Sequence, residues 1–406
     1  MRVLWFFRSW GRRLWPHHPA LLAGLWVLIQ LVYLRQFHGP HFANDSARYL
    51  QYAAAIADRG YFAPGHNLRY VLYPLFQSLW LGLGLGWWGI VAGQMAVSAL
   101  ATRAVYMGTR RLAGGRPEAA ALATLLFIAW PDIQRFNVFL LTESLFISLV
   151  ALSFGAFARV HRGRGRDWAW LVVVLTLTAL ARPNGFLVGL AAGLAGLDAL
   201  RRGRDRRPWR AALLLLALLA PLLWQALNHQ LETYYLMDTY QRGELIFRYQ
   251  LWAVHQAAPL NMPPPGTGPA ARVLYFGVHN PVYLGRLMVG KLFVFLSYLK
   301  PHYSLLHRVV GVLVLWPGYV LAALAARRGT IWRPARVFLA AVFLLQTAVI
   351  TLTVDDWDVR FLAPVLPVVF VLAALELAAR WPALLLRGRP RNARASRPRP
   401  ASPRYE

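Results

Sequence analysis

Long apolar runs are the feature that most constrains how this chain can fold. Residues 211–227 (AALLLLALLAPLLWQAL) and 361–379 (FLAPVLPVVFVLAALELAA) are two of several such runs. Each has about the 17–25 residues that a helix needs to cross the hydrocarbon core of a bilayer. The composition agrees, because 58% of the 406 residues are hydrophobic and 15% are charged, against about 25% charged residues in a soluble globular protein. The sequence therefore predicts an all-α, polytopic membrane protein without a sizeable soluble domain.

Basic residues indicate how the chain is threaded through the membrane. The net charge is +28, from 44 Lys and Arg against 16 Asp and Glu, and in a soluble protein this excess would suggest nucleic-acid binding. Here most of the arginines lie in clusters between or after the apolar runs, and the positive-inside rule places such clusters in the cytoplasm. We therefore expect no nucleic-acid partner. The clusters cover residues 2–13, 110–116, 159–166, 201–210, 327–336 and 380–404.

About ten spans, with both termini in the cytoplasm, put every cluster on the inner side. This topology requires that the short segments 71–84 and 287–299 do not cross and form interfacial or re-entrant helices instead. The expected spans are 20–36, 88–108, 118–131, 138–158, 168–181, 184–199, 211–227, 305–326, 337–353 and 361–379.

The same topology divides the chain into functional parts. We expect a catalytic transmembrane module at 1–227 with a first outer loop at 37–87, a substrate-specific outer region at 228–304, C-terminal spans at 305–379 and a basic disordered tail at 380–406. The tail would lie near the anionic lipids of the membrane, which attract juxtamembrane arginines.

The stretch that follows the first span, NDSARYLQYAAAIADRG, reads as a short amphipathic helix headed by Asp45. Tyr49, Tyr52 and Ile56 fall on one face, as in a helix that lies along a membrane surface. Asp is a favoured N-cap residue, so capping alone would explain Asp45, with Ser46 as the rival cap. The alternative is that its carboxylate serves a site outside the cytoplasm.

Two further charged positions fall within or beside apolar runs. Glu143 lies inside FNVFLLTESLF, and Arg182 lies at the outer end of another expected span. A carboxylate at membrane depth is costly unless it faces a polar cavity or a partner. Glu143 is therefore a functional candidate or half of a buried ion pair with Arg182 or Arg135. Residues 355–360 (DDWDVR) group three acids with Arg360, either as a site or as a solvated helix end.

These charges suggest a chemistry. Arginine recognises phosphate through paired hydrogen bonds, and a carboxylate can accept a proton from a hydroxyl nucleophile. Together they favour group transfer from a lipid-linked phosphate carrier to an acceptor outside the cytoplasm. A non-enzymatic lipid or glycolipid transporter that uses the same outer crevice is the alternative, although the sequence lacks the repeated halves and paired broken helices typical of transporters.

The order of motifs resembles that of the GT-C glycosyltransferases. The motifs are NDSARY (44–49), LYPLF (72–76), RFNVFLLTESLF (135–146), ALARPNG (179–185) and DVRFLAPVLP (358–367). The likeness covers roughly 20–200 and 350–380 and is strongest to the bacterial branch related to protein O-mannosyltransferases and the lipid A aminoarabinose transferase. It implies a polyprenyl-phosphate sugar donor, a lipid, glycan or protein acceptor, and an active site on the outer side of the bacterial inner membrane.

The resemblance also suggests roles for individual residues. Asp45 occupies the place of the family's catalytic acid, so we expect it to be the general base of an inverting single displacement, with Glu143 as a second catalytic acid. Arg360 corresponds to a basic residue near the donor phosphate. Other substrate-binding candidates are Arg182, Arg69, Tyr49, Asp132, His66 and Asp358. Many members carry a second acid directly after the first, where this chain has Ser46. No metal ligand is therefore assigned, and a divalent metal stays an open candidate as cofactor.

Overall fold

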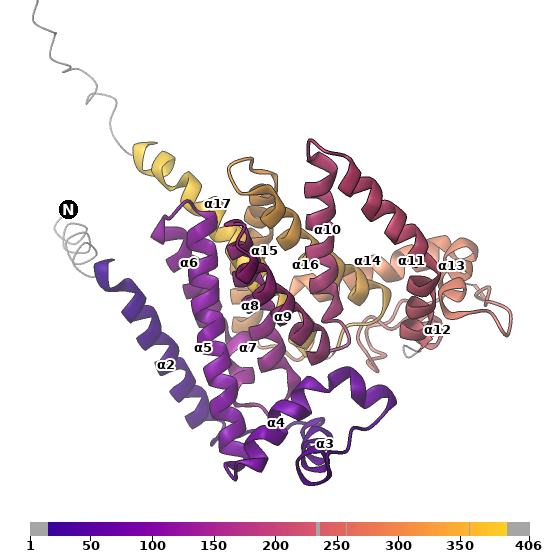
Figure 1. Ribbon diagram of the computed structural model, residues 1–406. Coiled ribbons are helices and arrows are strands. Elements are labelled where there is room, and N and C mark those ends of the chain that lie inside the picture. Colours follow the sequence, from indigo (N-terminus) through magenta and orange to yellow (C-terminus); the bar gives the residue numbers. More distant parts are fainter. Residues whose placement is uncertain (1–14, 233–235, 257, 357, 388–406) are drawn as a thin grey trace, which may run out of the picture.

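The computed structural model describes residues 15–232, 236–256, 258–356 and 358–387, and their regular elements are all helices (Figure 1). The ten segments expected to span are helical: α2 (His18–Gln36), α5 (Gly86–Leu112), α6 (Pro117–Ala129), α8 (Thr142–Val160), α9 (Gly165–Ala181), α10 (Phe186–Arg202), α11 (Arg207–Glu232), α15 (Leu305–Arg327), α16 (Arg333–Leu352) and α17 (Leu366–Arg387). The shorter elements are η1 (Trp15–His17), α3 (Ser46–Arg59), η2 (Gly65–Tyr70), α4 (Leu72–Gly82), α7 (Pro131–Gln134), η3 (Arg135–Val138), α12 (Leu236–Gln241), α13 (Pro269–His279), α14 (Pro281–Ser297), η4 (Val359–Phe361) and η5 (Ala363–Val365).

Seven segments of the described chain are long and apolar enough to cross a membrane. They are Trp15–Gln36, Gly86–Leu112, Thr142–Val160, Arg207–Glu232, Leu305–Arg327, Arg333–Leu352 and Val359–Arg380. The other three expected spans, α6, α9 and α10, are shorter helices of 13, 17 and 17 residues. The prediction of an all-α, polytopic membrane protein is confirmed. The short segments 71–84 and 287–299 lie largely in α4 and α14, which are not among the seven.

The helices differ in how much of their surface faces the protein. Every residue of α8 except Leu152 and Arg159 is buried, so α8 is the central helix. It packs closely on α5, where a Cβ added at Gly155 would lie 2.7 Å from the Cβ of Ala104. Small residues allow such close approach between membrane helices. By contrast, no residue of the described helix α11 is buried and all its leucines except Leu231 are exposed, as expected for a surface in contact with lipid.

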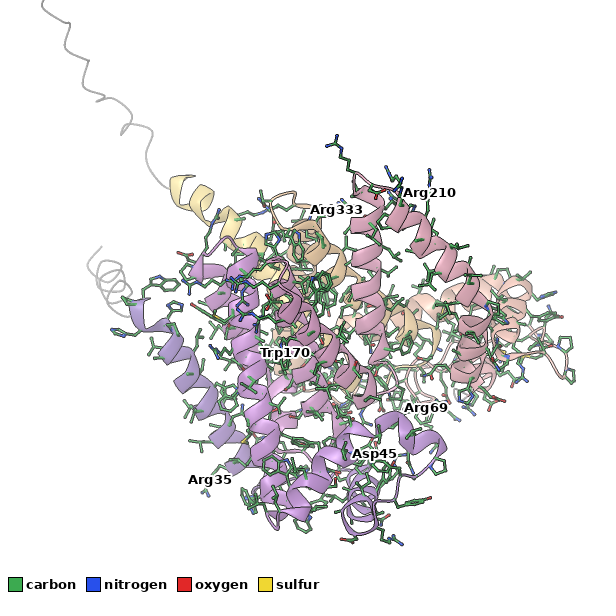
Figure 2. All side chains as sticks on the ribbon, viewed as in Figure 1. Arg35, Asp45, Arg69, Trp170, Arg210 and Arg333 are labelled. Atoms are coloured by element: carbon green, nitrogen blue, oxygen red, sulfur yellow. The ribbon has the colours of Figure 1, made fainter. Side chains whose placement is uncertain are left out.

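Charged residues mark the two ends of the bundle (Figure 2). Arg210, near the start of α11, and Arg333, at the start of α16, lie at one end. Arg35, Asp45 and Arg69 lie at the opposite end. The basic loops around residues 201–210 and 327–336 are thus separated from Asp45 by the length of the membrane-spanning helices. The arginine cluster at 2–13 and most of the tail, 388–406, lie outside the described residues.

Backbone hydrogen bonds tie the loops at the Asp45 end together. The His41 N–H donates to the Val138 carbonyl at 2.8 Å, and the Leu140 N–H donates to the His41 carbonyl at 2.9 Å. The stretch before α3 is therefore fixed to the stretch before α8. In the same way, the Phe247 N–H donates to the Asp355 carbonyl at 2.9 Å and joins the region after α12 to the loop between α16 and η4.

A buried polar network fixes the start of α8. The Asn137 side-chain amide donates to Gln30 and Ser98, both at 3.0 Å, and its oxygen accepts from Ser144 at 2.7 Å. Gln30 also donates to Gln134 at 2.8 Å. Buried polar groups that are satisfied in this way specify one arrangement of the helices that carry them. The network joins α2, α5, α7 and α8 directly beside Glu143.

The region between α11 and α15 has a small core of its own. Leu236, Tyr240, Phe276 and Leu287, from α12, α13 and α14, form a buried cluster separate from the main hydrophobic core.

The surroundings of helix α3 differ from expectation. Its apolar face, with Tyr49, is buried and packs on α4, where the Tyr49 ring contacts that of Tyr73 at 5.5 Å. The apolar face that the sequence pattern assigned to the membrane surface is thus covered by α4.

Candidate active site

Asp45 stands at the N-cap position of α3, yet its side chain makes no capping hydrogen bond to any described residue. Its Oδ2 lies 3.3 Å from Nη1 of Arg360, and its Oδ1 lies 3.5 Å from Nη2 of Arg48. Ser46 stabilises the turn instead, because its Oγ accepts the Ala43 backbone N–H at 2.9 Å. Capping therefore does not explain Asp45. The carboxylate is 34% exposed and accessible to a ligand.

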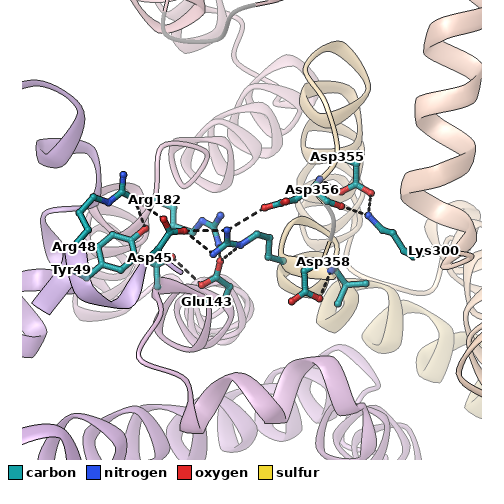
Figure 3. Close-up of polar contacts among 12 residues, drawn as sticks. Asp45, Arg48, Tyr49, Glu143, Arg182, Lys300, Asp355, Asp356 and Asp358 are labelled. Atoms are coloured by element: carbon teal, nitrogen blue, oxygen red, sulfur yellow. Dashed lines mark hydrogen bonds and ion pairs between the residues drawn. The ribbon is translucent and has the colours of Figure 1, made fainter. Parts of the chain in front are cut away.

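Arg360, on η4, contacts three of the acids labelled in Figure 3, Asp45, Glu143 and Asp356. Its Nε donates to Oε1 of Glu143 at 2.8 Å, and its Nη1 donates to Oδ2 of Asp356 at 3.2 Å. Both Nη1 and Nη2 lie 3.3 Å from Oδ2 of Asp45. One planar guanidinium thus joins three carboxylates from distant parts of the sequence through separate nitrogens in a fixed fork, whereas a lysine ammonium is a compact point charge.

Glu143 lies in the first turn of α8 and is fully buried. Its Oε1 also accepts a hydrogen bond from Nη1 of Arg182 at 2.6 Å. Arg182 is only 5% exposed, and its guanidinium carbon lies 5.7 Å from the Phe146 ring centre and 5.4 Å from that of Phe361. Desolvated cation–π contacts of this kind are favourable. The buried pair of Glu143 with Arg182 is therefore present, and Glu143 also orients Arg360.

The loop between α16 and η4 is held by the chain's two lysines. Lys291, on α14, donates to the Thr353 carbonyl, and Lys300 forms an ion pair with Asp355; both lysines are buried. Burial raises the pKa of Asp355 to about 6, against the opposing effect of Lys300. Sequence reasoning missed both lysines, although a buried role is suggested by their being the only lysines in a chain that otherwise uses arginine.

Asp132 and Asp358 belong to a second cluster, around Arg135. Nη2 of Arg135 lies 2.5 Å from Oδ1 of Asp358 and 3.2 Å from Oδ1 of Asp132. Asp132 is fully buried, with Nε2 of His307 3.6 Å from its Oδ2. These contacts fix η3, η4 and the start of α15 relative to one another. The structure therefore places Asp132 and Asp358 beside the Arg360 cluster, among contacts that hold the helix ends.

The remaining candidates lie on α3 and η2. Tyr49 is 4% exposed, its hydroxyl accepts a hydrogen bond from Arg48 at 3.4 Å, and burial followed by the nearby Glu143 raises its pKa. Tyr49 is thus a neutral packing residue beside the cluster. Arg69 is partly buried on η2. The backbone of His66 lies on the same element, but its side chain is outside the described part of the structure.

Two adjoining cavities open beside these residues. The first, which we call the central cavity, has a volume of about 480 Å³. Its polar wall contains Arg48, Arg182 and Asp356, which contact Asp45, Glu143 and Arg360 respectively. Its apolar wall contains Pro183, Val349, Ile350 and Phe361.

The second, which we call the adjoining cavity, has a volume of about 670 Å³ and shares Phe247, Thr353 and Val354 with the first. Both volumes are typical of small-molecule sites, which range over about 300–1,000 Å³. Over the described ranges, no group of three or more His, Asp or Glu side chains is arranged to hold a metal ion.

No protein-family model matches the sequence, and neither does any curated protein. Several solved structures are similar, among them the following three. ArnT from Cupriavidus metallidurans, bound to undecaprenyl phosphate, gives a TM-score of 0.50 at 16% identity over 90% of this chain and 62% of that one. The Archaeoglobus fulgidus oligosaccharyltransferase AglB, in complex with an inhibitory peptide and a dolichol-phosphate, gives 0.50 at 14% identity over 96% and 53%. The A. fulgidus oligosaccharyltransferase tethered to an acceptor peptide gives 0.52 at 16% identity over 93% and 51%.

The chain thus spans about half to three fifths of the length of the structures it resembles. ArnT and AglB are both GT-C glycosyltransferases, so the fold that the motif order predicted is confirmed. The protein has the membrane fold of the GT-C glycosyltransferases.

Proposed function

We propose that the protein is a glycosyltransferase that moves a sugar from a polyprenyl-phosphate donor to an acceptor hydroxyl. The observation that carries this proposal is the central cavity, whose lining combines Arg182 with an apolar wall. Arg182 pairs with Glu143, which also binds Arg360, and Arg360 in turn contacts Asp45. Val349 and Ile350, in that wall, lie near the end of the membrane-spanning helix α16. A site with guanidinium groups on one side and a membrane helix on the other suits a ligand with a phosphate and a long hydrocarbon tail.

The similar structures support the same class of ligand. ArnT was solved with undecaprenyl phosphate and AglB with a dolichol-phosphate, both isoprenoid phosphates. In this chain Arg182 lines the central cavity, and its Nε has no hydrogen-bond partner among the described residues. A buried guanidinium nitrogen without a partner is costly. A phosphate oxygen of the donor would supply the missing acceptor.

The mechanism that we assign to this site is a single displacement. Asp45 accepts the proton of the acceptor hydroxyl, and the oxygen attacks the anomeric carbon of the donor sugar. The bond from that carbon to the phosphate oxygen breaks, and polyprenyl phosphate leaves with the bonding electrons. Negative charge grows on the departing phosphate, where Arg182 and Arg360 would stabilise it. One displacement inverts the anomeric configuration.

Glu143 has a positioning role in this mechanism. The side chain is fully buried, so it cannot contact the acceptor, and its Oε1 binds Arg182 and Arg360 at once. A carboxylate fixed by packing holds the two guanidinium groups at a constant separation, and preorganised charges of this kind lower the barrier without reorganising during the reaction.

The proposal includes the orientation in the membrane. The arginine-rich loops at 201–210 and 327–336 would face the cytoplasm, and the Asp45 end would face the outer side of a bacterial inner membrane with both termini inside. The donor's isoprenoid chain would then stay in the bilayer while the acceptor arrives from outside.

The test is transfer by the purified full-length protein in lipid nanodiscs. We would supply a panel of polyprenyl-phosphate sugars with mixed saccharide, peptide and lipid acceptors, and measure released polyprenyl phosphate and labelled product. A glycosyltransferase yields both in equal amounts, with the anomeric configuration inverted. A transporter would move the donor across proteoliposome membranes without releasing polyprenyl phosphate, and that result would refute the proposal.

A further inference from the structure

The adjoining cavity is a built site that the mechanism above does not use. It is larger than the central cavity, at about 670 Å³, and the two share the wall formed by Phe247, Thr353 and Val354. This wall is fixed, because the Phe247 N–H donates to the Asp355 carbonyl at 2.9 Å and Lys291 donates to the Thr353 carbonyl. A ligand in the adjoining cavity would therefore lie next to the central cavity, across the wall that the two cavities share.

A buried carboxylate in the lining lacks a partner for one of its oxygens. Glu244 is 2% exposed, and its Oε1 accepts from Nε of Arg242 at 2.7 Å. Its Oε2 has no hydrogen-bond partner among the described residues. Buried polar atoms in native proteins are nearly all hydrogen-bonded, so an unpaired carboxylate oxygen in a cavity wall indicates a missing donor. A ligand hydroxyl would supply it.

Three other polar side chains of the lining are available to a ligand. Asp238, Arg248 and Gln250 are exposed, and within the described chain none of the three is seen in a side-chain hydrogen bond or ion pair. Arg248 has a φ of 57°, in the left-handed region that costs energy for a residue with a Cβ, and its guanidinium lies 5.1 Å from the centre of the Phe247 ring. Strained backbone of this kind is found at ligand sites.

The lining chemistry selects among ligand classes. Two arginines are balanced by two carboxylates, Asp238 and Glu244, so the cavity does not favour a simple anion. Its walls carry too many polar groups for a hydrocarbon chain. Sugar hydroxyls both donate and accept hydrogen bonds, so they match a lining that alternates carboxylates, guanidinium groups and an amide. The apolar face of a sugar ring could rest on Phe247, the aromatic side chain of the shared wall.

We propose that the adjoining cavity binds the acceptor and that the acceptor is a saccharide, free or as the head of a larger glycan. This rests on the proposed glycosyltransferase function and names the acceptor class for the same site. The acceptor ring would lie between Asp238, Glu244 and Arg248, and its reacting hydroxyl would point past Phe247 into the central cavity.

Saccharide binding can be measured without any donor. We would record saturation-transfer difference NMR on the full-length protein in nanodiscs, with maltose, mannobiose and N,N′-diacetylchitobiose as probes and a serine-containing tripeptide and glycerol as comparisons. At least one disaccharide should bind. Asp238→Asn and Arg248→Ala should each raise its Kd about tenfold or more, because each removes a charge-assisted hydrogen bond. Arg286→Ala is the control, since this exposed arginine on α14 is not part of the described lining of either cavity.

The outcomes separate this inference from the function on which it rests. Three results would overturn the saccharide site. They are the absence of disaccharide binding, a disaccharide Kd in the Asp238 and Arg248 variants equal to that of wild type, and binding of the tripeptide or glycerol alone. Release of polyprenyl phosphate with transfer only to peptide or lipid would also overturn it and leave the glycosyltransferase standing. Disaccharide binding that both cavity variants weaken, in a protein that cleaves no donor, would support the site and refute the transferase.

Discussion

A variant that breaks the buried pair of Glu143 and Arg182 by removing one charge should be less stable than wild type. A variant that removes both charges should keep most of the wild-type stability. The two side chains are 0% and 5% exposed and 2.6 Å apart. In Glu143→Gln the Arg182 guanidinium would lose its buried anionic partner and keep only a neutral amide oxygen and its ring contacts with Phe146 and Phe361. Leaving one member of a buried ion pair without its partner costs about 3–5 kcal/mol.

The interactions that Arg360 loses in the same variant should cost less folding free energy than those that Arg182 loses. It keeps Asp45 and Asp356, whose side chains are 34% and 27% exposed, and partly exposed pairs contribute about 0–1 kcal/mol. The double variant Glu143→Gln/Arg182→Met removes the pair as a unit, and such replacements are often close to neutral. We therefore expect the double variant to be more stable than Glu143→Gln by several kcal/mol, a coupling that independent sites do not show.

The assay combines thermal unfolding, followed by tryptophan fluorescence in nanodiscs, with sugar transfer by the same samples. Arg333→Gln is the matched control, because it breaks an exposed pair with Asp198 of similar length, 2.7 Å, and should leave the Tm unchanged. Transfer by the double variant should stay about 100-fold below wild type or lower, the usual effect of removing a preorganised electrostatic group.

Two results would refute this reasoning. If the double variant recovered both stability and transfer, Glu143 and Arg182 would form a structural pair without a part in the reaction. If Glu143→Gln melted like the Arg333 control, the burial argument itself would be wrong.

Three further predictions concern the charge cluster, the topology and pH. Arg360→Lys should lower kcat/KM about 100-fold, since a compact ammonium lacks the planar fork whose separate nitrogens reach the three carboxylates; activity within threefold of wild type would contradict this. The chain has no cysteine, so Asp58→Cys should react with a membrane-impermeant maleimide added to intact cells and Arg204→Cys should not; the reverse pattern would invert the topology. The pKa of Asp355 is about 6, above about 3.9 in the unfolded chain, so its stabilising contribution is complete below about pH 4 and is lost as the pH rises through about 6. The Tm of wild type relative to Asp355→Asn should therefore fall from pH 4 to 7, and a rise would show that the Lys300 pair outweighs burial.

The positions of the apolar helices were the part of the fold that the sequence predicted well, because apolar run length is a local property; seven described segments are long and apolar enough to cross. Residues 211–227 lie within α11, which spans Arg207–Glu232, and the other helix ends shift by only a few residues except in α17, which extends to Arg387 instead of 379. Which helix faces are buried against protein could not be predicted from the apolar runs alone. The face of α3 that carries Tyr49 has the pattern of a membrane-surface helix, and only the long-range packing of α4 shows that protein covers it.

The site was partly predictable for the same reason. Asp45, Glu143 and Arg360 each stood out locally, as an acid beside a span, an acid within a span and an arginine among acids. Their pairing could not be read from the sequence, since one guanidinium joins residues more than 300 positions apart. Lys300 and the Asn137 network were missed because their roles arise from contacts between loops that the folded chain brings together.

The measurement that tests the account most directly is transfer by Asp45→Asn. The amide preserves the size of the side chain but cannot accept the hydroxyl proton as a carboxylate does, and loss of a general base typically lowers the rate about 10²–10⁴-fold. With a donor that wild type uses, we predict that Asp45→Asn folds with an unchanged fluorescence spectrum and releases polyprenyl phosphate at least about 100-fold more slowly. A folded Asp45→Asn protein that transfers sugar at the wild-type rate would contradict the account.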